Sequence, residues 1–342
     1  MEKRFLGRSG LQVSALSYGV MTFGGDDNFK VVGNTQVDEA RRLVDLSIDH
    51  GVTLFDTADI YSDGLAESIL GEVLEGRRQD VLVATKAFGT MGPGDHDVGL
   101  SRRHLIDACD ASLRRLRTDW IDLYQVHGFD SYVPLEETLR ALDDLVRSGK
   151  VRYIGCSNYF AWQLTRALGL SERAGLERFI GQQIQYSLLV RDAEIELLPA
   201  GIEQGVGALI WSPLAGGYLT GKFRDAEASS SRLAQSDQLG ALDTARPRAV
   251  VDALFEVAGE LDGATPSQVA LAWLQQRPGV TSVIIGARNE AQLLDNLKAA
   301  ELTLSDAAMR KLDAVSHVAK GYPFEHQQRW SFNRSTSPFP ES

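Results

Sequence analysis

The sequence is poor in cysteine, in long apolar runs and in positive charge, and each shortage excludes a class of protein. Two cysteines in 342 residues exclude a disulfide-rich scaffold, so we expect Cys109 and Cys156 to be buried thiols in a cytoplasmic protein. No apolar run is as long as a membrane span, and the first residues carry no apolar signal core. A net charge of −11 argues against nucleic acid, because phosphate binding needs clustered Lys and Arg. We therefore expect neither a nucleic-acid partner nor a membrane partner.

Metal-ligand spacings and nucleotide-binding glycine motifs are also missing. The six histidines form no pair at ligand spacing, which argues against a metal site and a metal-dependent hydrolase. No G-x-G-x-x-G follows the first strand-like segment, which disfavours an open dinucleotide-binding sheet. Residues 216–223 nearly match a P-loop, but Phe223 stands where a hydroxyl residue would bind Mg²⁺. That segment still offers glycines that admit a pyrophosphate, followed by a lysine.

Strand-like and helix-like segments alternate along the chain after a hairpin-like segment at residues 4–13. The expected strand–helix pairs are 16–20 with 36–50, 53–55 with 65–74, 81–85 with 102–116, 120–126 with 135–147, 151–156 with 160–168, 181–185 with 194–204, 207–211 with 248–261, and 281–286 with 290–299. Eight such units predict an α/β fold, a (β/α)₈ barrel that forms one domain over residues 1–342. The hairpin region covers residues 1–15, a long loop covers 212–247, and an aromatic tail covers 321–342.

Ionisable side chains follow three successive strands, on the face where a barrel of this kind carries its active site. They are Asp56 and Tyr61, then Lys86, then His127. An ammonium beside a phenol lowers the pKa of the phenol, so Tyr61 could donate a proton to a carbonyl oxygen. Taken singly, Asp56 could be a helix N-cap and Tyr61 a loop aromatic, but three successive strand ends favour chemistry. Asp59, in the same motif, receives no role.

At these residues the chain resembles the aldo-keto reductase family. The matching motifs are Phe-Asp-Thr-Ala-Asp-Ile-Tyr at 55–61, Thr-Lys at 85–86, Asp-Leu-Tyr-Gln-Val-His at 122–127, Gly-Cys-Ser-Asn at 155–158, Gln-Ile-Gln-Tyr-Ser-Leu-Leu at 183–189, Trp-Ser-Pro-Leu-Ala-Gly-Gly at 211–217, and Gly-Ala-Arg-Asn at 286–289 continuing to Asn296. The resemblance runs from about residue 6 to about residue 312 and is strongest to a bacterial branch that is similar to potassium-channel β-subunits. It implies that Asp56, Tyr61, Lys86 and His127 are the catalytic tetrad.

The resemblance also implies a nicotinamide dinucleotide that lies extended over the barrel mouth. The implied cofactor-binding residues are Gly19, Met21, Ser157, Asn158, Gln183, Trp211, Ser212, Leu214, Gly217, Lys222, Arg232, Gly286, Arg288, Gln292, Asp295 and Asn296. Trp211 would stack on the nicotinamide ring, and Arg232 would lie in a loop that closes over the cofactor. Arg288 fits a 2′-phosphate and favours NADP(H). Gln292 stands where the family often has a second basic residue, which leaves use of NAD(H) open.

The expected activity is interconversion of a carbonyl and an alcohol, with a small molecule as substrate. Aromatic residues after the strands could wall an apolar substrate pocket, or could be ordinary packing at the rim: Phe23, Phe88, Phe129 and Tyr159. The alternative function is an NADP(H)-binding regulatory protein, like the channel β-subunits, with slow catalysis. The substrate and the direction of the reaction are not set by these patterns. The aromatic tail packs either over the barrel mouth or on a second copy of the chain, so a homo-oligomer stays open.

Overall fold

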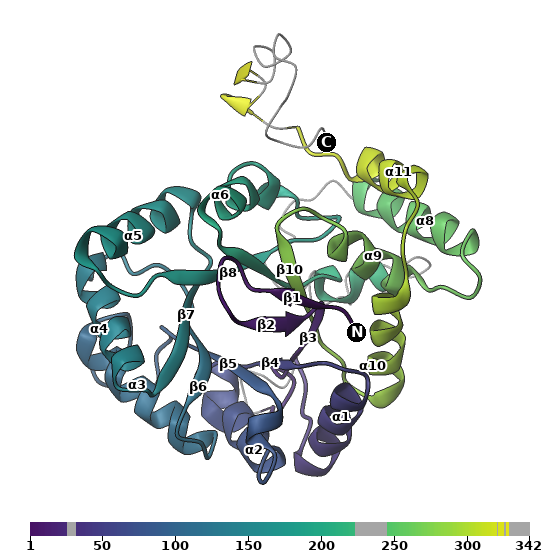
Figure 1. The fold of residues 1–342 in the computed structure, drawn as a ribbon. Coiled ribbons are helices and arrows are strands. Elements are labelled where there is room, and N and C mark those ends of the chain that lie inside the picture. The colour runs from purple at the N-terminus through teal and green to yellow at the C-terminus, as the bar shows by residue number, and fades with distance from the viewer. Residues whose placement is uncertain (26–31, 223–244, 320, 325, 328–342) are drawn as a thin grey trace.

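The structure is a computed structural model that describes residues 1–25, 32–222, 245–319, 321–324 and 326–327. Eight parallel strands close into a barrel with helices around its outside, as Figure 1 shows. Around the ring the strands are β3 (Leu16–Gly19), β4 (Leu54–Asp56), β5 (Leu82–Ala87), β6 (Ile121–Val126), β7 (Val151–Ser157), β8 (Phe179–Gln185), β9 (Gly207–Trp211) and β10 (Val280–Ile285), which pairs back onto β3. The predicted (β/α)₈ barrel is therefore confirmed.

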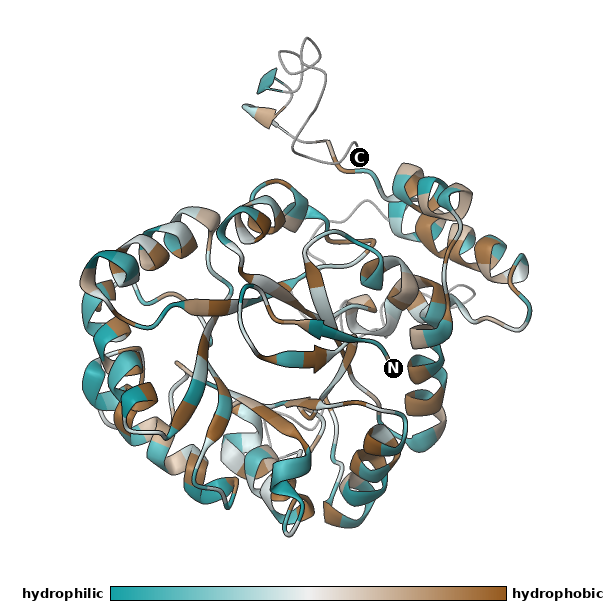
Figure 2. Cartoon of the chain, in the orientation of Figure 1, coloured by the Kyte–Doolittle hydropathy of each residue, from teal (hydrophilic) through white to brown (hydrophobic). Residues whose placement is uncertain are grey.

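The helices of the described residues form a ring outside the strands. They are α1 (Val37–Asp49), α2 (Leu65–Val73), α3 (Arg102–Arg115), α4 (Leu135–Arg147), α5 (Ala161–Ala174), α6 (Leu197–Gln204), α8 (Ala245–Gly259), α9 (Pro266–Gln275), α10 (Glu290–Leu297) and α11 (Asp306–Ser316). Hydrophilic residues lie along the outer side of this ring, as Figure 2 shows. The main apolar core lies between the strands and the helices. Strands of a parallel sheet that are covered on both faces carry apolar side chains on both faces. None of the described helices is long and apolar enough to cross a membrane.

One predicted strand–helix pair is wrong. The sequence pattern paired strand 207–211 with helix 248–261 and did not reveal α9. In the chain, α9 lies between that helix and β10, and it packs against β10 and α10. Every residue from Ser267 to Gln275 is buried, so α9 has no polar face and shows no amphipathic period. Its sequence signal is the capping box of Thr265 and Gln268 with Pro266 at the first helical position. The predicted helix is α8, which lies farther out beside α11 in Figure 1.

The predicted hairpin is confirmed, and it plugs the end of the barrel where the strands begin. Strands β1 (Lys3–Phe5) and β2 (Gln12–Ser14) pair antiparallel. The hairpin buries Leu6, Leu11 and Val13 against an inner layer of strand residues. That layer consists of Leu54, Ala84, Leu123, Leu209 and Ile284 with their neighbours. The hairpin closes one end of the barrel. The inward-facing side chains of the next layer therefore lie toward the other end, where the strands finish.

Candidate active site

Side chains of alternating strand residues point into the barrel, and this period of two builds the site. In β4, β5 and β6 the inner apolar layer contains Leu54, Ala84 and Leu123. Two residues farther along each strand stand Asp56, Lys86 and Gln125, and all three are buried. The layer above the plug is therefore polar. Since all eight strands are parallel, their C-terminal ends bring these side chains together at one rim.

Lys86 and Asp56 form a fully buried ion pair at the centre of this layer. Lys86 Nζ donates to Asp56 Oδ1 at 2.6 Å and to the Thr57 carbonyl at 2.8 Å. The other carboxylate oxygen of Asp56 accepts from Gln183 Nε2 at 2.7 Å and from Gln125 Nε2 at 3.4 Å. Burial by itself would lower the pKa of Lys86, but the Asp56 carboxylate reverses this and holds that pKa above its ordinary value. The lysine therefore stays charged at neutral pH.

Tyr61 begins the short helical turn η1 (Tyr61–Gly64) that follows β4, and its hydroxyl lies 3.5 Å from Lys86 Nζ. The residues after it, Ser62 and Asp63, have left-handed backbone with φ near +50°. The Ser62 hydroxyl holds that backbone by donating to the Phe23 carbonyl at 3.0 Å. Burial raises the pKa of Tyr61 above its ordinary value, although the Lys86 ammonium acts in the opposite direction. Tyr61 is thus a protonated phenol at neutral pH, and the lysine only reduces the effect of burial.

His127 follows β6, and its ring meets the Tyr61 ring edge-on with centroids 5.9 Å apart. Its backbone N–H donates to the Ala87 carbonyl at 3.0 Å, which fixes it beside the end of β5. Burial and the nearby Lys86 ammonium lower the pKa of His127 to about 3. The imidazole is therefore neutral at physiological pH, with one N–H to donate and no charge. The structure thus brings all four predicted tetrad residues together.

Four of the residues implied for the nicotinamide end are joined by hydrogen bonds. Asn158, whose backbone is left-handed with φ +57°, donates its side-chain amide to the His127 carbonyl at 3.0 Å and accepts from Trp211 Nε1 at 3.1 Å. Ser157 Oγ donates to the Gln183 carbonyl at 3.0 Å. Because the Gln183 amide nitrogen already donates to Asp56, a bound carboxamide would meet the oxygen of that side chain. This group therefore links a planar aromatic ring to the polar layer that contains Asp56.

The segment after β9 turns tightly around the short helical turn η4 (Ala215–Thr220). Left-handed backbone recurs there at Ser212, Ala215, Gly216, Gly217 and Gly221. A Cβ built on Gly217 would lie 3.3 Å from Lys222 Nζ, so backbone and ammonium approach one another closely. Successive backbone turns of this kind make anion-binding concavities. Leu214 is partly exposed beside them. The residues present therefore fit a pyrophosphate, and they are the ones that the sequence singled out.

The residues implied for the adenosine end cluster where β10 leads into α10. Arg288 is exposed one residue before the Asn289 N-cap, and its Nε donates to the Val32 carbonyl at 3.3 Å. The Gln292 side chain accepts from the Arg288 backbone N–H at 3.0 Å. Asn296 Nδ2 donates to the carbonyl of Gly286, at whose Cα the space for a side chain is open. The N-terminus of a helix with an adjacent guanidinium is suited to phosphate.

Asp295 has a different set of partners from the one implied for it. Its carboxylate accepts from Thr265 Oγ1 at 3.0 Å and from Gln268 Nε2 at 2.7 Å, and both donors belong to the cap of α9. This residue therefore ties α10 to α9. On the neighbouring strand β3, Gly19 stands where a Cβ would come within 2.8 Å of Ile284, and Met21 is exposed just beyond it. Arg232 lies outside the described residues, as do most of the predicted loop and tail.

Two of the four aromatic residues expected near the substrate are buried. Phe23 is completely buried and packs on Tyr18 with ring centroids 6.2 Å apart, which favours the alternative that it is ordinary packing at the rim. Tyr159 is only 3 % exposed and packs edge-on against Phe129 at 5.2 Å and against Phe179 behind it. Only Phe88 and Phe129 are partly exposed at the rim. Whether each of these rings is buried or exposed depends on the direction of its side chain in the loop after the strand. The alternation of residues within a strand does not extend into that loop, so it does not predict the direction.

Sequence reasoning gave no role to several polar groups of this site. Gln125 donates a hydrogen bond to Asp56. The alternation of side chains along a strand could have identified it, because Leu123, Gln125 and His127 are two residues apart and Leu123 faces the inside of the barrel. Glu67 is fully buried beneath the rim and paired with Arg115 at 2.7 Å. No sequence period reveals that contact, since it joins α2 to α3.

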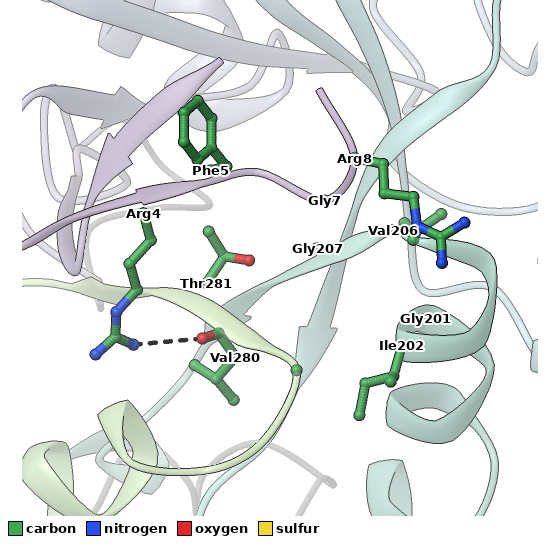
Figure 3. Close-up of a pocket in the computed structure, with 12 residues that line it drawn as sticks. Arg4, Phe5, Gly7, Arg8, Gly201, Ile202, Val206, Gly207, Val280 and Thr281 are labelled. Carbon is green, nitrogen blue, oxygen red and sulfur yellow. Dashed lines mark hydrogen bonds between the residues drawn. The ribbon is translucent and has the colours of Figure 1, made fainter. Parts of the chain in front are cut away.

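A separate pocket of about 350 Å³ lies at the other end of the barrel (Figure 3). It lies between the hairpin and the first residues of β9 and β10, and Arg4 there donates to the Val280 carbonyl at 3.3 Å. None of the tetrad residues lines it. Among the residues that the structure describes, no three His, Cys, Asp or Glu side chains are grouped to hold a metal ion.

Comparisons with known proteins agree over almost the whole chain. A model of the aldo/keto reductase family matches residues 15–317. The chain is 39% identical over 331 residues to an uncharacterized oxidoreductase, YrpG, of Bacillus subtilis (strain 168). The matched region covers 92% of this chain and 96% of that protein. The chain is 38% identical over 326 residues to a probable voltage-gated potassium channel subunit beta of Arabidopsis thaliana, with the same coverage. A putative voltage-gated potassium channel subunit beta of Schizosaccharomyces pombe is 36% identical over 339 residues and 95% of each chain.

Proposed function

Because the chain belongs to the aldo/keto reductase family and is an NAD(P)H-dependent oxidoreductase, we propose that it interconverts a carbonyl and an alcohol with Tyr61 as the general acid and base. One observation carries the proposal: the Tyr61 hydroxyl lies 3.5 Å from a buried ammonium that is itself held by Asp56 at 2.6 Å. A phenol, an ammonium and a neutral imidazole meet at one rim of the barrel. These are the groups that proton transfer to a carbonyl oxygen requires.

The bound nicotinamide supplies the hydride, and the residues of this chain handle the proton. Tyr61 carries its proton at neutral pH, because burial raises the pKa of the phenol. As negative charge develops on the substrate oxygen, that oxygen becomes a stronger base than the phenolate, and the phenol donates. Lys86 then stabilises the phenolate that remains, since the two groups are 3.5 Å apart. The neutral His127 donates a hydrogen bond to the same oxygen without adding a charge.

We further propose NADP(H) as the preferred cofactor, with Arg288 as the residue that selects it. Trp211 and Asn158 would hold the nicotinamide end, and the backbone turns before Lys222 would hold the pyrophosphate. The guanidinium of Arg288 stands exposed at the start of α10, where it suits a 2′-phosphate. Gln292 adds no second positive charge, so discrimination against NADH rests on one residue.

The decisive experiment replaces Tyr61 by Phe, which removes one oxygen and keeps the ring. NADPH binding, followed by quenching of tryptophan fluorescence, should stay within about twofold, while kcat for aldehyde reduction falls by about 10² to 10⁴. Tyr132→Phe is the matched control, because Tyr132 is 96% exposed in a loop after β6. Near-normal turnover of the Tyr61 variant would show that another group donates the proton.

The similarity to proteins named as potassium channel β-subunits favours a second candidate function. In that case the chain binds the nicotinamide cofactor as a regulatory subunit, and its turnover is slow. Steady-state rates with a panel of aldehydes and ketones, measured in both directions with both cofactors, separate the two functions. Fast turnover with any member of the panel favours the enzyme, and stoichiometric binding to a channel without turnover favours the subunit.

We also propose that the whole chain acts as one catalytic unit in the cytoplasm. The two cysteines, Cys109 and Cys156, are both buried and unpaired, which suits a reducing compartment. The substrate is a small carbonyl compound or alcohol, and partly exposed Phe88 and Phe129 give the rim beside His127 an apolar side. Cell fractionation of the tagged chain, with a cytoplasmic and a membrane marker, tests the location.

A further inference from the structure

One buried carboxyl group beside the proposed tetrad has no role in the chemistry described so far. Asp59 lies between Asp56 and Tyr61 in the chain, and its side chain is completely buried. Its backbone N–H donates to the Lys86 carbonyl at 3.1 Å, which fixes it behind the ion pair. Within the described part of the chain, neither carboxyl oxygen of Asp59 accepts a hydrogen bond of regular geometry, and the nearest donor is the Ile60 backbone N–H, which acts to lower the pKa. An ionised carboxylate in such a place is costly, so the geometry favours a neutral acid.

The charges around Asp59 are already balanced without it. Lys86 pairs with Asp56, and Arg115 donates to Glu67 at 2.7 Å. Glu67 is also fully buried and accepts a second hydrogen bond from the Thr85 hydroxyl. Among the described residues, Asp59 is therefore the one carboxyl of these three that forms no ion pair.

The groups that face Asp59 come from four neighbouring elements. They are Glu67 of α2, Lys86 of β5, Arg115 of α3 and Tyr124 of β6. Burial and the Glu67 carboxylate raise the pKa of Asp59 to about 7, against the opposing effects of the Ile60 backbone N–H, Arg115 and Lys86. The field of Asp59 also acts on the Tyr61 phenol, whose pKa an ionised Asp59 raises. A proton on Asp59 therefore changes the acidity of the residue that donates to substrate.

We propose that Asp59 is a positioning residue that acts as a neutral carboxylic acid, and that loss of its proton weakens proton donation by Tyr61. With Asp59 neutral, Lys86 has one ionised partner and can stabilise the developing phenolate. With Asp59 ionised, a second negative charge lies behind the lysine and opposes a negative charge on Tyr61. The enzyme then reduces carbonyls more slowly although its tetrad is intact. This inference rests on the proposed function, in which Tyr61 is the acid.

The test is the pH profile of Asp59→Asn, which keeps the shape of the side chain and removes its charge. The kcat for reduction of 4-nitrobenzaldehyde at saturating NADPH is measured from about pH 6 to about pH 8.5. In the unaltered protein kcat should fall by up to about tenfold over this range, because an ionised Asp59 raises the pKa of the Tyr61 phenol and makes it a weaker acid. In the Asp59→Asn variant the fall should be less than about twofold, with the rate at low pH retained. Asp63→Asn is the matched control, since Asp63 is exposed in the same turn and should leave the profile unchanged.

The outcomes separate this inference from the proposed function. If Asp59→Asn kept the pH profile of the unaltered protein, or lowered kcat equally at every pH, Asp59 would have only a structural role. If Tyr61→Phe turned over normally, the proposed function itself would fail. Infrared spectroscopy of the unaltered protein gives a reading that does not depend on a folded variant or on activity. The C=O stretch of a buried protonated acid should be present at about pH 6 and lost by about pH 9. Its absence at the lower pH would overturn the proposal.

Discussion

Replacing Lys86 by Met should destabilise the protein far more than replacing an exposed lysine with the same kind of partner. Lys86 and Asp56 are 0% and 4% exposed and lie 2.6 Å apart. Without the ammonium, the buried carboxylate keeps Gln183 and Gln125 as donors but has no opposite charge. Breaking a buried pair from one side costs about 3–5 kcal/mol of unfolding free energy, because the remaining charge is uncompensated. We expect a loss in that range at neutral pH.

The control is Lys150→Met. Lys150 and Asp110 are also 2.6 Å apart, but both side chains are 37% exposed, and such pairs contribute about 0–1 kcal/mol. Urea unfolding followed by tryptophan fluorescence and by circular dichroism gives both losses, and coincident curves justify the two-state treatment. The double variant Asp56→Asn with Lys86→Met should recover at least about 2 kcal/mol while remaining inactive. The reasoning is refuted if Lys86→Met costs no more than Lys150→Met, or if removing the Asp56 charge recovers nothing.

Two further predictions concern the cofactor and pH. Arg288→Gln should raise KM for NADPH by about tenfold or more and change KM for NADH by less than about twofold, since only NADPH carries the 2′-phosphate; equal effects on both would remove Arg288 as the selecting residue. His127 should show no imidazole titration by NMR between about pH 5 and about pH 8, because folding lowers its pKa from 6.5 to about 3. The unfolded chain then binds more protons below 6.5, so this group lowers stability as the pH falls toward 3, and His127→Gln should reduce that loss.

The barrel could be predicted because its strands are short apolar runs that recur with helices between them. The meeting of Asp56, Tyr61, Lys86 and His127 at one rim could be predicted for a related reason, since they lie at or after the ends of successive strands and parallel strands end at one rim. The helix α9 could not, because its residues from Ser267 to Gln275 are all buried and leave no polar face to give a period. The burial of Phe23 could not be predicted either, because it depends on the backbone after β3, which places the ring against Tyr18.

The pKa of Tyr61 shows where sequence reasoning stops in the site. The sequence places an ammonium near the phenol, and this alone predicts a lowered pKa. The structure adds the burial of the ring, which raises that pKa by more than Lys86 lowers it. Contacts across the barrel cannot be predicted from local sequence either. Gln183 and Asp56 are 127 positions apart in the chain, and they meet because both side chains point into the barrel from β8 and β4. Burial and cross-barrel contacts depend on closure, which no local pattern contains.

The rim divides into two electrostatic halves, and this division explains how a chain of net charge −11 can bind an anionic cofactor. Around β4, β5 and β6 two buried carboxylates have cationic partners, Asp56 with Lys86 and Glu67 with Arg115, which limits the local field there. Around β9 and β10 the features are backbone turns, Lys222 and the exposed Arg288, which favour phosphate. Since β10 pairs with β3 to close the ring, the two halves adjoin, and a dinucleotide across the mouth would bring its redox-active end to Tyr61. The net charge of the chain therefore matters less for binding than the position of a few groups on one rim.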